Sequence, residues 1–208
     1  MARAVLGVRD HCGWAVLVGL GGEVAAPRVL LRERITLLDD PALPDQPYHA
    51  AAGLALGEAA SLIARVEGSA RAAARDALAR AAGELTDRGH EPVGVALDLG
   101  AVGAGRMALP EDLGAVLGKH HFLHGAEGEL YHEALVDGAR SLGLAVGRYD
   151  FKVLGDTAAP VLGPGAADLV GSLRAQVGPP WTRDHKDAAL AALLLLAAGP
   201  HGGALPTG

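Results

Sequence analysis

The sequence predicts an α/β fold with a mixed sheet, in which three antiparallel strands come first and helix-separated parallel strands follow. Three observations predict it. The first 38 residues hold three apolar runs joined by short turns. Residues 49–88, which come next, are mostly alanine, leucine, arginine and glutamate and have high helix propensity. Two further apolar runs then alternate with helical segments, and strands separated in this way lie parallel.

The antiparallel part begins with residues 3–9, a short apolar run that ends at the turn-prone residues 10–13. Residues 14–20 form the second expected strand and residues 28–38 the third. Alternation along the third strand places three arginines on one face of the sheet: Arg28, Arg32 and Arg34.

The later elements follow from helix propensity and from short apolar runs bounded by glycine and proline. Three prolines make residues 39–48 irregular. The expected elements after them are a helical segment at 49–88 (one long helix or two abutting ones), a strand at 93–99, an amphipathic helix at 127–142, a strand at 145–151, a short helix at 166–176 and a final helix at about 183–198.

The amino-acid composition is that of a globular domain and argues against an extended surface for nucleic acid. The 208 residues are 50% hydrophobic and 20% charged, so the chain can bury a core, and we expect one domain over residues 1–208 with a flexible tail at about 199–208. The formal net charge is -6, so a surface for polyanions would have to be local. Only 3% of the residues are aromatic, which argues against stacking platforms for nucleic acid.

The single cysteine, Cys12, excludes an internal disulfide and a cysteine-rich zinc module. The most apolar run, residues 188–198, is shorter than the roughly 20 residues that cross a bilayer. The first residues lack a long apolar signal core, so we expect a cytoplasmic protein without a membrane partner. The sequence leaves both a monomer and a homo-oligomer open.

Asp10 and Asp98 each stand at the end of a predicted strand. Asp98 is the only charge on a strand that is otherwise apolar, and ligands of open α/β sheets bind at such strand ends. Both residues also have a structural explanation, because aspartate is common in hairpin turns and as the cap of a loop.

Asp184 and Asp187 open the final helix and share one face of it. Acids in a first helical turn also stabilise the helix dipole, by roughly 0.3–1 kcal/mol each. Asp10, Asp98 and Asp184 or Asp187 come from three elements that adjoin in the expected fold. Together they would hold one or two Mg²⁺ or Mn²⁺ ions, which orient phosphate and activate water.

Residues 119–133 are the densest polar stretch, and four of the nine histidines fall within thirteen residues there. In a helix that starts near His121, His124 and Glu127 share one face. Another face would carry Glu129, His132 and Glu133. Imidazole and carboxylate both bind zinc, manganese and iron, so a metal site is one interpretation. An exposed helix face without metal is the other.

The predicted order of strands and helices is similar to that of the ribonuclease H-like superfamily, which includes RuvC-like resolvases, YqgF-type nucleases and actin-like ATPases. The resemblance covers most of the chain and implies metal-binding acids on the first strand and near the start of the last helix. A family of predicted nucleases opens with a similar Gly-Val-Asp, Gly-Trp run. Here Arg9 stands where that family has its acid, and Asp10 follows on the opposite face of the strand.

Three segments together resemble a group of bacterial proteins without an assigned activity. They are residues 46–50 (Gln-Pro-Tyr-His-Ala), residues 124–130 (His-x-x-Glu-Gly-x-Leu), and Pro180-Trp181 followed by Lys186 and an alanine-rich helix. This resemblance directs attention to His124, Glu127 and Lys186. We expect a buried Glu127 to pair with Lys186 or His124, in a pocket walled by Asp98 or by residues 100–105; a purely structural ion pair is the alternative.

The sequence thus predicts a metal-dependent phosphodiesterase or nuclease-like hydrolase that acts on nucleic acid or a small phosphorylated ligand. The expected metal ligands are Asp10, Asp98, Asp184 and Asp187. The expected catalytic residues are Asp98, His124, Glu127 and Lys186. A non-catalytic small-molecule-binding or interaction domain on the same fold is the alternative, and the acidic net charge and scarce lysine favour it.

Overall fold

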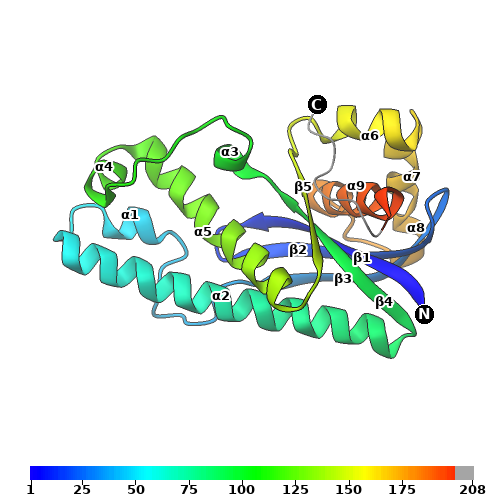
Figure 1. The fold of residues 1–208 in the computed structure, drawn as a ribbon, viewed down its shortest axis with the longest axis horizontal. Coiled ribbons are helices and arrows are strands. Elements are labelled where there is room, and N and C mark those ends of the chain that lie inside the picture. Colours follow the sequence, from blue (N-terminus) through cyan, green and yellow to red (C-terminus); the bar gives the residue numbers. More distant parts are fainter. Residues whose placement is uncertain (200–208) are drawn as a thin grey trace.

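The computed structural model describes residues 1–199 and contains a five-stranded sheet with the order β3-β2-β1-β4-β5 (Figure 1). β1 lies in the middle of the sheet, antiparallel to β2 and parallel to β4. This is the mixed sheet that the sequence predicts. The expected flexible tail lies outside the described residues, apart from Gly199.

The antiparallel half consists of β1 (Ala2–His11), β2 (Trp14–Glu23) and β3 (Ala26–Thr36). His11 pairs with Trp14, which leaves Cys12 and Gly13 as a two-residue turn. Gly13 has a φ of 77°, a conformation that glycine adopts without strain from a Cβ atom. Asp10 therefore belongs to the strand, and its placement in the hairpin turn is wrong.

A bulge in β3 changes the expected arrangement of its arginines. Gly19 of β2 pairs with Leu31 and Leu20 pairs with Val29, so Leu30 is an extra residue in β3. The extra residue reverses the alternation of faces. Arg28 consequently lies on the opposite face from Arg32 and Arg34, and the prediction that all three share a face is wrong.

The parallel half consists of β4 (His90–Asp98) and β5 (Ala145–Tyr149). Four helices lie on one side of the sheet or beyond its end: α1 (Pro47–Ala51), α2 (Leu56–Asp87), α4 (Leu113–Leu117) and α5 (His120–Ser141). The expected segment 49–88 is thus two helices. The short α3 (Gly100–Gly103) follows β4 directly.

The α2 and α5 helices cover one face of the sheet and pack closely against each other. Small residues make this approach possible, because the α2 side facing the core is largely alanine. At Gly138 of α5, a Cβ atom would lie 3.1 Å from the backbone nitrogen of Arg75 in α2. The glycine lets the two helix backbones nearly touch.

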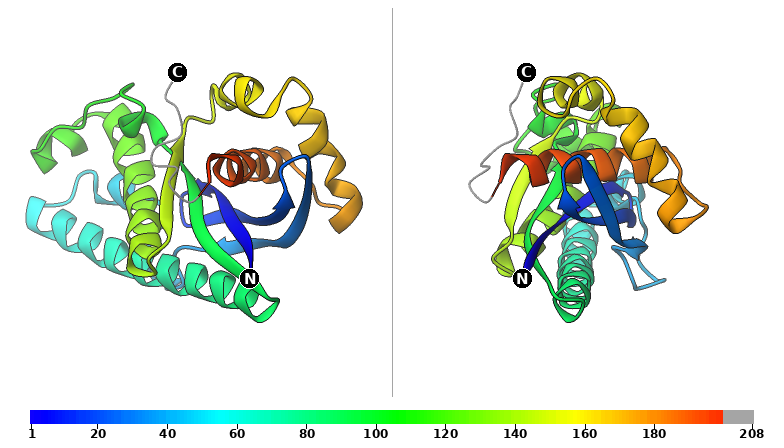
Figure 2. Two further views of the ribbon diagram at one scale, coloured as in Figure 1. Left: turned by 45° about the vertical axis from the view of Figure 1, so that its right-hand side comes forward. Right: turned by 90° about the vertical axis from the view of Figure 1, so that its right-hand side faces the viewer.

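The α9 helix (Arg183–Ala198) covers the opposite face, as the two views of Figure 2 show. Its backbone lies directly on β1, because a Cβ atom at Gly7 would overlap the carbonyl oxygen of Ala188. The expected pairing of Glu127 with Lys186 would need α5 and α9 on the same region of the sheet, and the two helices instead cover opposite faces.

The connection between β5 and α9 contains three short helices: α6 (Leu154–Leu162), α7 (Ala166–Ser172) and α8 (Arg174–Val177). They pack beside α9 and β3. The single helix expected at 166–176 is broken at Leu173, and α6 is not among the expected elements. No helix in the described part of the chain is long and apolar enough to span a membrane.

Candidate functional site

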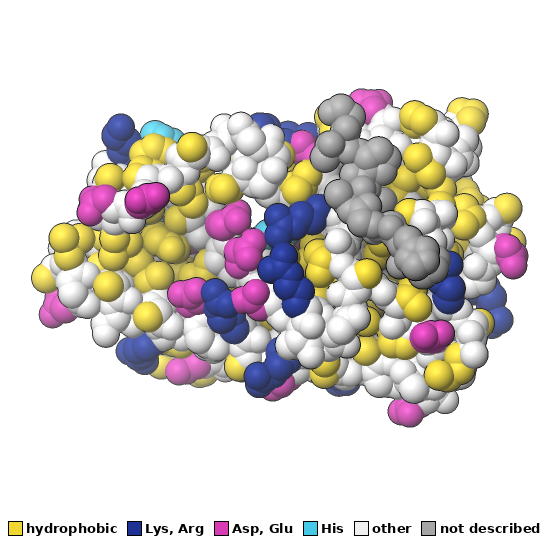
Figure 3. Space-filling model, in the orientation of Figure 1, with side chains coloured by type: hydrophobic (Ala, Val, Ile, Leu, Met, Phe, Trp, Pro, Cys, Tyr) yellow, Lys and Arg dark blue, Asp and Glu magenta, His cyan; other side chains and the backbone are white. Residues whose placement is uncertain are grey.

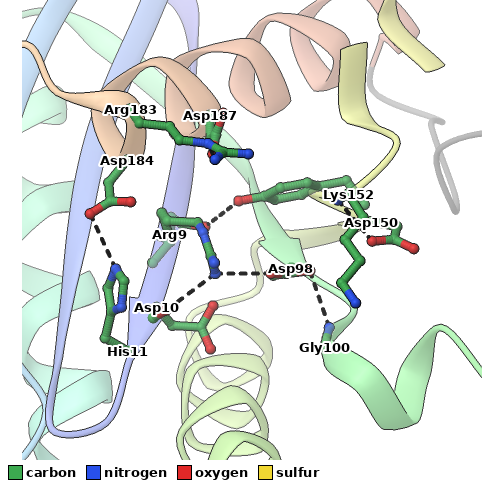
Figure 4. Close-up of polar contacts among 12 residues, drawn as sticks. Arg9, Asp10, His11, Asp98, Gly100, Asp150, Lys152, Arg183, Asp184 and Asp187 are labelled. Carbon is green, nitrogen blue, oxygen red and sulfur yellow. Dashed lines mark hydrogen bonds and ion pairs between the residues drawn. The ribbon is translucent and has the colours of Figure 1, made fainter. Parts of the chain in front are cut away.

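Arg9 and Asp98 meet at the carboxyl ends of two neighbouring parallel strands. Gly7 of β1 pairs with Ala96 of β4, and each side chain of interest stands two residues further along its strand. Both side chains consequently lie at the same level and on the face that α9 covers (Figure 4).

The two side chains form a buried ion pair. Nη1 of Arg9 lies 2.9 Å from Oδ2 of Asp98, and the side chains are only 15% and 4% exposed. The N–H of Gly100 donates to Oδ1 of Asp98 at 3.1 Å. Burial raises the pKa of the Asp98 carboxyl, while Arg9 and the N–H groups of Gly100 and Phe151 act in the opposite direction. Each carboxylate oxygen thus has a donor from the protein itself.

The guanidinium of Arg9 also stacks on an aromatic ring, since its central carbon lies 4.0 Å from the ring centre of Phe151. The neighbouring Tyr149 donates its hydroxyl to the carbonyl of Val8 at 2.8 Å. The ion pair with Asp98 and the stacking on Phe151 together hold the guanidinium of Arg9 in place.

Asp10 points away from α9, toward the helix below the sheet (Figure 4). Its Oδ1 is buried and has no hydrogen-bond partner among the described residues. Burial, together with the negative charge of Asp98, raises the pKa of Asp10 to about 7, although Arg9 acts against this. The structure therefore places this carboxylate on the far side of β1 from the other expected metal ligands.

The first turn of α9 brings Asp184 and Asp187 to the strand ends. Oδ2 of Asp184 lies 3.2 Å from Nε2 of His11, and Oδ2 of Asp187 lies 3.6 Å from Nε of Arg183. Burial raises the pKa of Asp187, and Arg183 and then Arg9 lower it. The arrangement thus gathers Asp98, Asp184 and Asp187 on one face, around Arg9.

These residues do not fit a magnesium centre built on Asp98. A divalent ion would need the place beside this carboxylate that the guanidinium of Arg9 takes. Arginine keeps its positive charge throughout the pH range in which proteins are folded, so it cannot make way by losing a proton. Arg9, Asp98, Asp184 and Asp187 are together called the strand-end group. In this group the positive charge beside Asp98 is supplied by Arg9 and not by a metal ion.

A second polar group lies on α1 and the first turns of α5. His49, on α1, has its Nδ1 2.9 Å and 2.8 Å from the two carboxylate oxygens of Glu127, and its backbone N–H donates to Oε1 at 3.0 Å. The Glu127 side chain is 1% exposed. The rings of His120 and His124 lie beside that of His49, with centroids 5.1 Å and 4.5 Å away.

The partner of Glu127 differs from the one expected. Glu127 is buried, but it pairs with His49 and not with Lys186 or His124. Lys186 is exposed on α9, across the sheet from α5. The segment 46–50 was the one available signal for His49, because it resembled the same group of proteins as the segment that contains Glu127.

The second expected face of α5 is not an exposed one. His132 is 2% exposed, and neither of its ring nitrogens has a partner among the described residues. Burial, with a smaller effect of Arg148, lowers the pKa of His132 to about 4. Glu133 lies 3.6 Å from Arg148 instead. This imidazole is therefore a neutral core residue.

The fold is ribonuclease H-like, as the sequence predicts. Two solved structures that resemble the chain are both RuvC: "T. thermophilus RuvC in complex with Holliday junction substrate" and "Thermus thermophilus RuvC structure". The first has a TM-score of 0.55 at 16% identity and covers 99% of either chain. The second has a TM-score of 0.55 at 17% identity and covers 98% of this chain and 99% of that one. No family model and no curated protein matches the sequence.

Proposed function

We propose that this chain is a ribonuclease H-like domain that binds a small molecule and does not cleave phosphodiesters with Mg²⁺. The observation that carries the proposal is the Arg9–Asp98 pair, in which the guanidinium lies where an ion bound to this carboxylate oxygen would have to lie. Nuclease chemistry on this fold needs a cation that can bind phosphate and water together. A guanidinium held by Asp98 and Phe151 activates no water.

The charge around the strand ends supports the same proposal. Asp184 and Asp187 add two carboxylates to the face that carries the Arg9–Asp98 pair, which is unfavourable for a phosphate backbone. On the face shown in Figure 3, the basic side chains near the middle form a short band with acidic side chains beside it, and the other basic side chains are scattered. Long nucleic acid is normally bound by a continuous basic surface, which this face lacks.

Two hollows beside Trp14 have the size of small-molecule sites, at about 380 Å³ and about 360 Å³. Both adjoin the strand-end group, since His11 stacks on Trp14 at 4.1 Å and contacts Asp184. The guanidinium of Arg34 lies 4.1 Å from the ring centre of Trp14 and lines both hollows. The first hollow is lined by Trp14, Val16, Arg32, Glu33, Arg34, Pro180, Thr182, Asp184 and His185.

Titration of the full chain with Mg²⁺, followed by calorimetry, tests the absence of nuclease chemistry. We expect no saturable binding and no cleavage of linear DNA or of a Holliday junction, the substrate present in one of the similar RuvC structures. Saturable Mg²⁺ binding that disappears in both Asp184→Asn and Asp187→Asn, with junction cleavage, would overturn the proposal.

Ligand-detected NMR with a panel of nucleotides, sugar phosphates and organic acids tests the binding function. A ligand of the hollows should bind the wild type at least tenfold more tightly than Arg34→Gln. Arg28→Gln is the matched control, because Arg28 is an exposed arginine of the same strand on the other face. Equal affinity in all three proteins, or no binding from the panel, would contradict the assignment of the hollows.

A metal-dependent phosphodiesterase is the second candidate, with Asp10, Asp98, Asp184 and Asp187 as proposed metal ligands. The observation that favours it is the meeting of Asp98, Asp184 and Asp187 from two separate elements on one face. It requires Arg9 to leave Asp98 when the ion binds, and the Mg²⁺ titration distinguishes the two candidates.

A further inference from the structure

Three histidines from two helices come together at one end of the molecule. His120 and His124 are four residues apart on α5 and so lie on the same face of the helix, and His49 faces them from α1. One ring nitrogen from each residue lies within 4.8 Å of the other two. Such a set of neutral nitrogen donors suits a divalent transition-metal ion.

The buried Glu127 is the second, independent observation. Its carboxylate faces Nδ1 of His49 and also accepts the backbone N–H of the same residue. Nδ1 of His49 is therefore committed to the carboxylate, and Nε2 is left as the nitrogen that can bind a ligand. A carboxylate on the far nitrogen of a metal-binding histidine fixes the tautomer and the ring orientation, and raises the basicity of the other nitrogen.

The separation of the nitrogens is close to that of a metal site. A zinc–nitrogen bond is about 2.1 Å long, so tetrahedral ligands are about 3.4 Å apart. The His120 and His124 side chains are exposed, so no packed core opposes the small rotations about their side-chain bonds that would close the remaining separation. His49 is the partly buried member and needs no such movement, because Glu127 already holds it.

We propose that His49, His120 and His124 form a three-histidine site for a divalent transition-metal ion such as Zn²⁺, with Glu127 as the residue that positions His49. The exposure of two of the three ligands leaves a fourth coordination position open to solvent. This site is separate from the strand-end carboxylates and does not depend on the function proposed for them.

Titration of the untagged full chain with Zn²⁺ against a competing chelator, and with Co²⁺ followed by its visible absorption, tests the site. We expect one equivalent to bind, with a Co²⁺ spectrum typical of low coordination number. His120→Gln and His124→Gln should each lower the affinity for Zn²⁺ at least tenfold. His121→Gln is the matched control, because His121 is exposed on the same helix but lies outside the cluster.

Glu127→Gln tests the positioning residue. The amide oxygen can still accept the N–H of His49, so the fold should survive, while the affinity for Zn²⁺ should fall about 10- to 100-fold. The inflection in the pH dependence of Zn²⁺ affinity should move to lower pH in this variant, because the carboxylate no longer raises the basicity of His49, whereas a merely structural role would lower the affinity without moving the inflection.

The proposal is overturned if wild type and the double variant of His120 and His124 bind Zn²⁺ equally. It is also overturned if His121→Gln weakens binding as much as His124→Gln, because the ion is then held by scattered surface histidines. An unchanged affinity in Glu127→Gln, with the histidine variants behaving as expected, removes only the positioning role.

Discussion

Two buried carboxylates, Asp98 and Glu127, illustrate two solutions to the same electrostatic problem. Their side chains are 4% and 1% exposed, and neither could be buried as an unpaired anion without a cost of several kcal/mol. Asp98 is paired with an arginine and Glu127 with a histidine. The carboxylates are alike, so the difference in chemistry between the two regions comes from the partner.

The arginine leaves no room for a metal ion beside its carboxylate, which makes the Asp98 site closed. The histidine keeps one ring nitrogen free for a ligand, which makes the Glu127 site open. The charge of Arg9 is permanent, and its guanidinium is held by Asp98 and Phe151. The imidazole of His49 satisfies Glu127 through one nitrogen and presents the other to His120 and His124. A carboxylate–arginine pair therefore leaves no ligand atom free, while a carboxylate–histidine pair leaves one ring nitrogen that can bind a metal ion.

The largest expected effect comes from removing the internal cation. Arg9→Met leaves Asp98 buried without a partner and should lower the free energy of unfolding by about 3–5 kcal/mol, measured by urea denaturation at pH 7. Arg71→Met is the control, because Arg71 pairs with Glu67 and Asp137 at the exposed surface, and it should cost less than about 1 kcal/mol. Equal small losses would mean that the strand-end pair is not a closed unit.

Gly7→Ala should show whether the α9 face of the sheet and the histidine cluster are independent of each other. The new methyl group overlaps the backbone of Ala188 in α9, and a backbone cannot rotate away, so we expect a loss of about 3 kcal/mol. Gly128→Ala on α5 meets nothing within 4 Å and should instead stabilise by roughly 0.5–1 kcal/mol. The Zn²⁺ affinity of folded Gly7→Ala should match the wild type; a large loss would show that the two regions are coupled.

Asp10→Asn should change how stability depends on pH. The pKa of Asp10 is about 7 in the folded protein, whereas the ordinary value of 3.8 applies to the unfolded chain. Between pH 4 and 7 the Asp10 carboxyl is therefore protonated in the folded protein and ionised in the unfolded chain. Stability contributed by this protonation is lost as the pH rises from 4 to 7. The variant should exceed the wild type by about 2 kcal/mol at pH 8, and the difference should vanish near pH 4.

The difference between variant and wild type isolates this group, because His132 acts in the opposite direction. The pKa of His132 is lowered to about 4, so its burial costs stability as the pH falls from 6.5 toward 4. Both proteins contain His132, so its contribution cancels. A constant difference across this pH range would contradict the shifted pKa of Asp10.

The smallest expected effect is that of Glu127→Gln on the metal-free protein. The amide of the variant can still accept the backbone N–H of His49, so the substitution should cost only about 1 kcal/mol in urea denaturation. Asp98→Asn is the matched change at the other carboxylate. It leaves the charge of Arg9 buried and should cost about 3 kcal/mol. Equal costs would remove the distinction between the two pairs.

Local patterns in the sequence predict much of the fold. Apolar runs and turns locate the three antiparallel strands, and the final helix starts at Arg183 as expected. Strict alternation also predicts correctly that Arg9 and Asp10 face opposite sides of β1. The same rule fails in β3, because the extra residue Leu30 has no signature in the pattern of side chains.

The start of α5 shows a second limit. Gly125 and Gly128 lower helix propensity, yet α5 begins at His120 and runs through both. At Gly125 a Cβ atom would overlap the sulfur of Met107, so the glycine serves a tertiary contact within a helix. A contact of this kind is invisible in a local pattern.

The site pairs are the least predictable part, because each joins residues that are distant in the sequence. Arg9 and Asp98 are 89 residues apart, and His49 and Glu127 are 78 apart. The sequence identifies three of these four residues as notable. Which of them meet depends on which helix covers which face of the sheet, and helix periodicity carries no such information.

The most direct test of the contrast between a closed and an open site is the anomalous diffraction of one crystal soaked in Mn²⁺, an ion that accepts both carboxylate and imidazole ligands. The account predicts one anomalous peak, among His49, His120 and His124, and none beside Asp98, where Arg9 remains within hydrogen-bonding distance. A peak among Asp98, Asp184 and Asp187, with Arg9 displaced from the carboxylate, would contradict it.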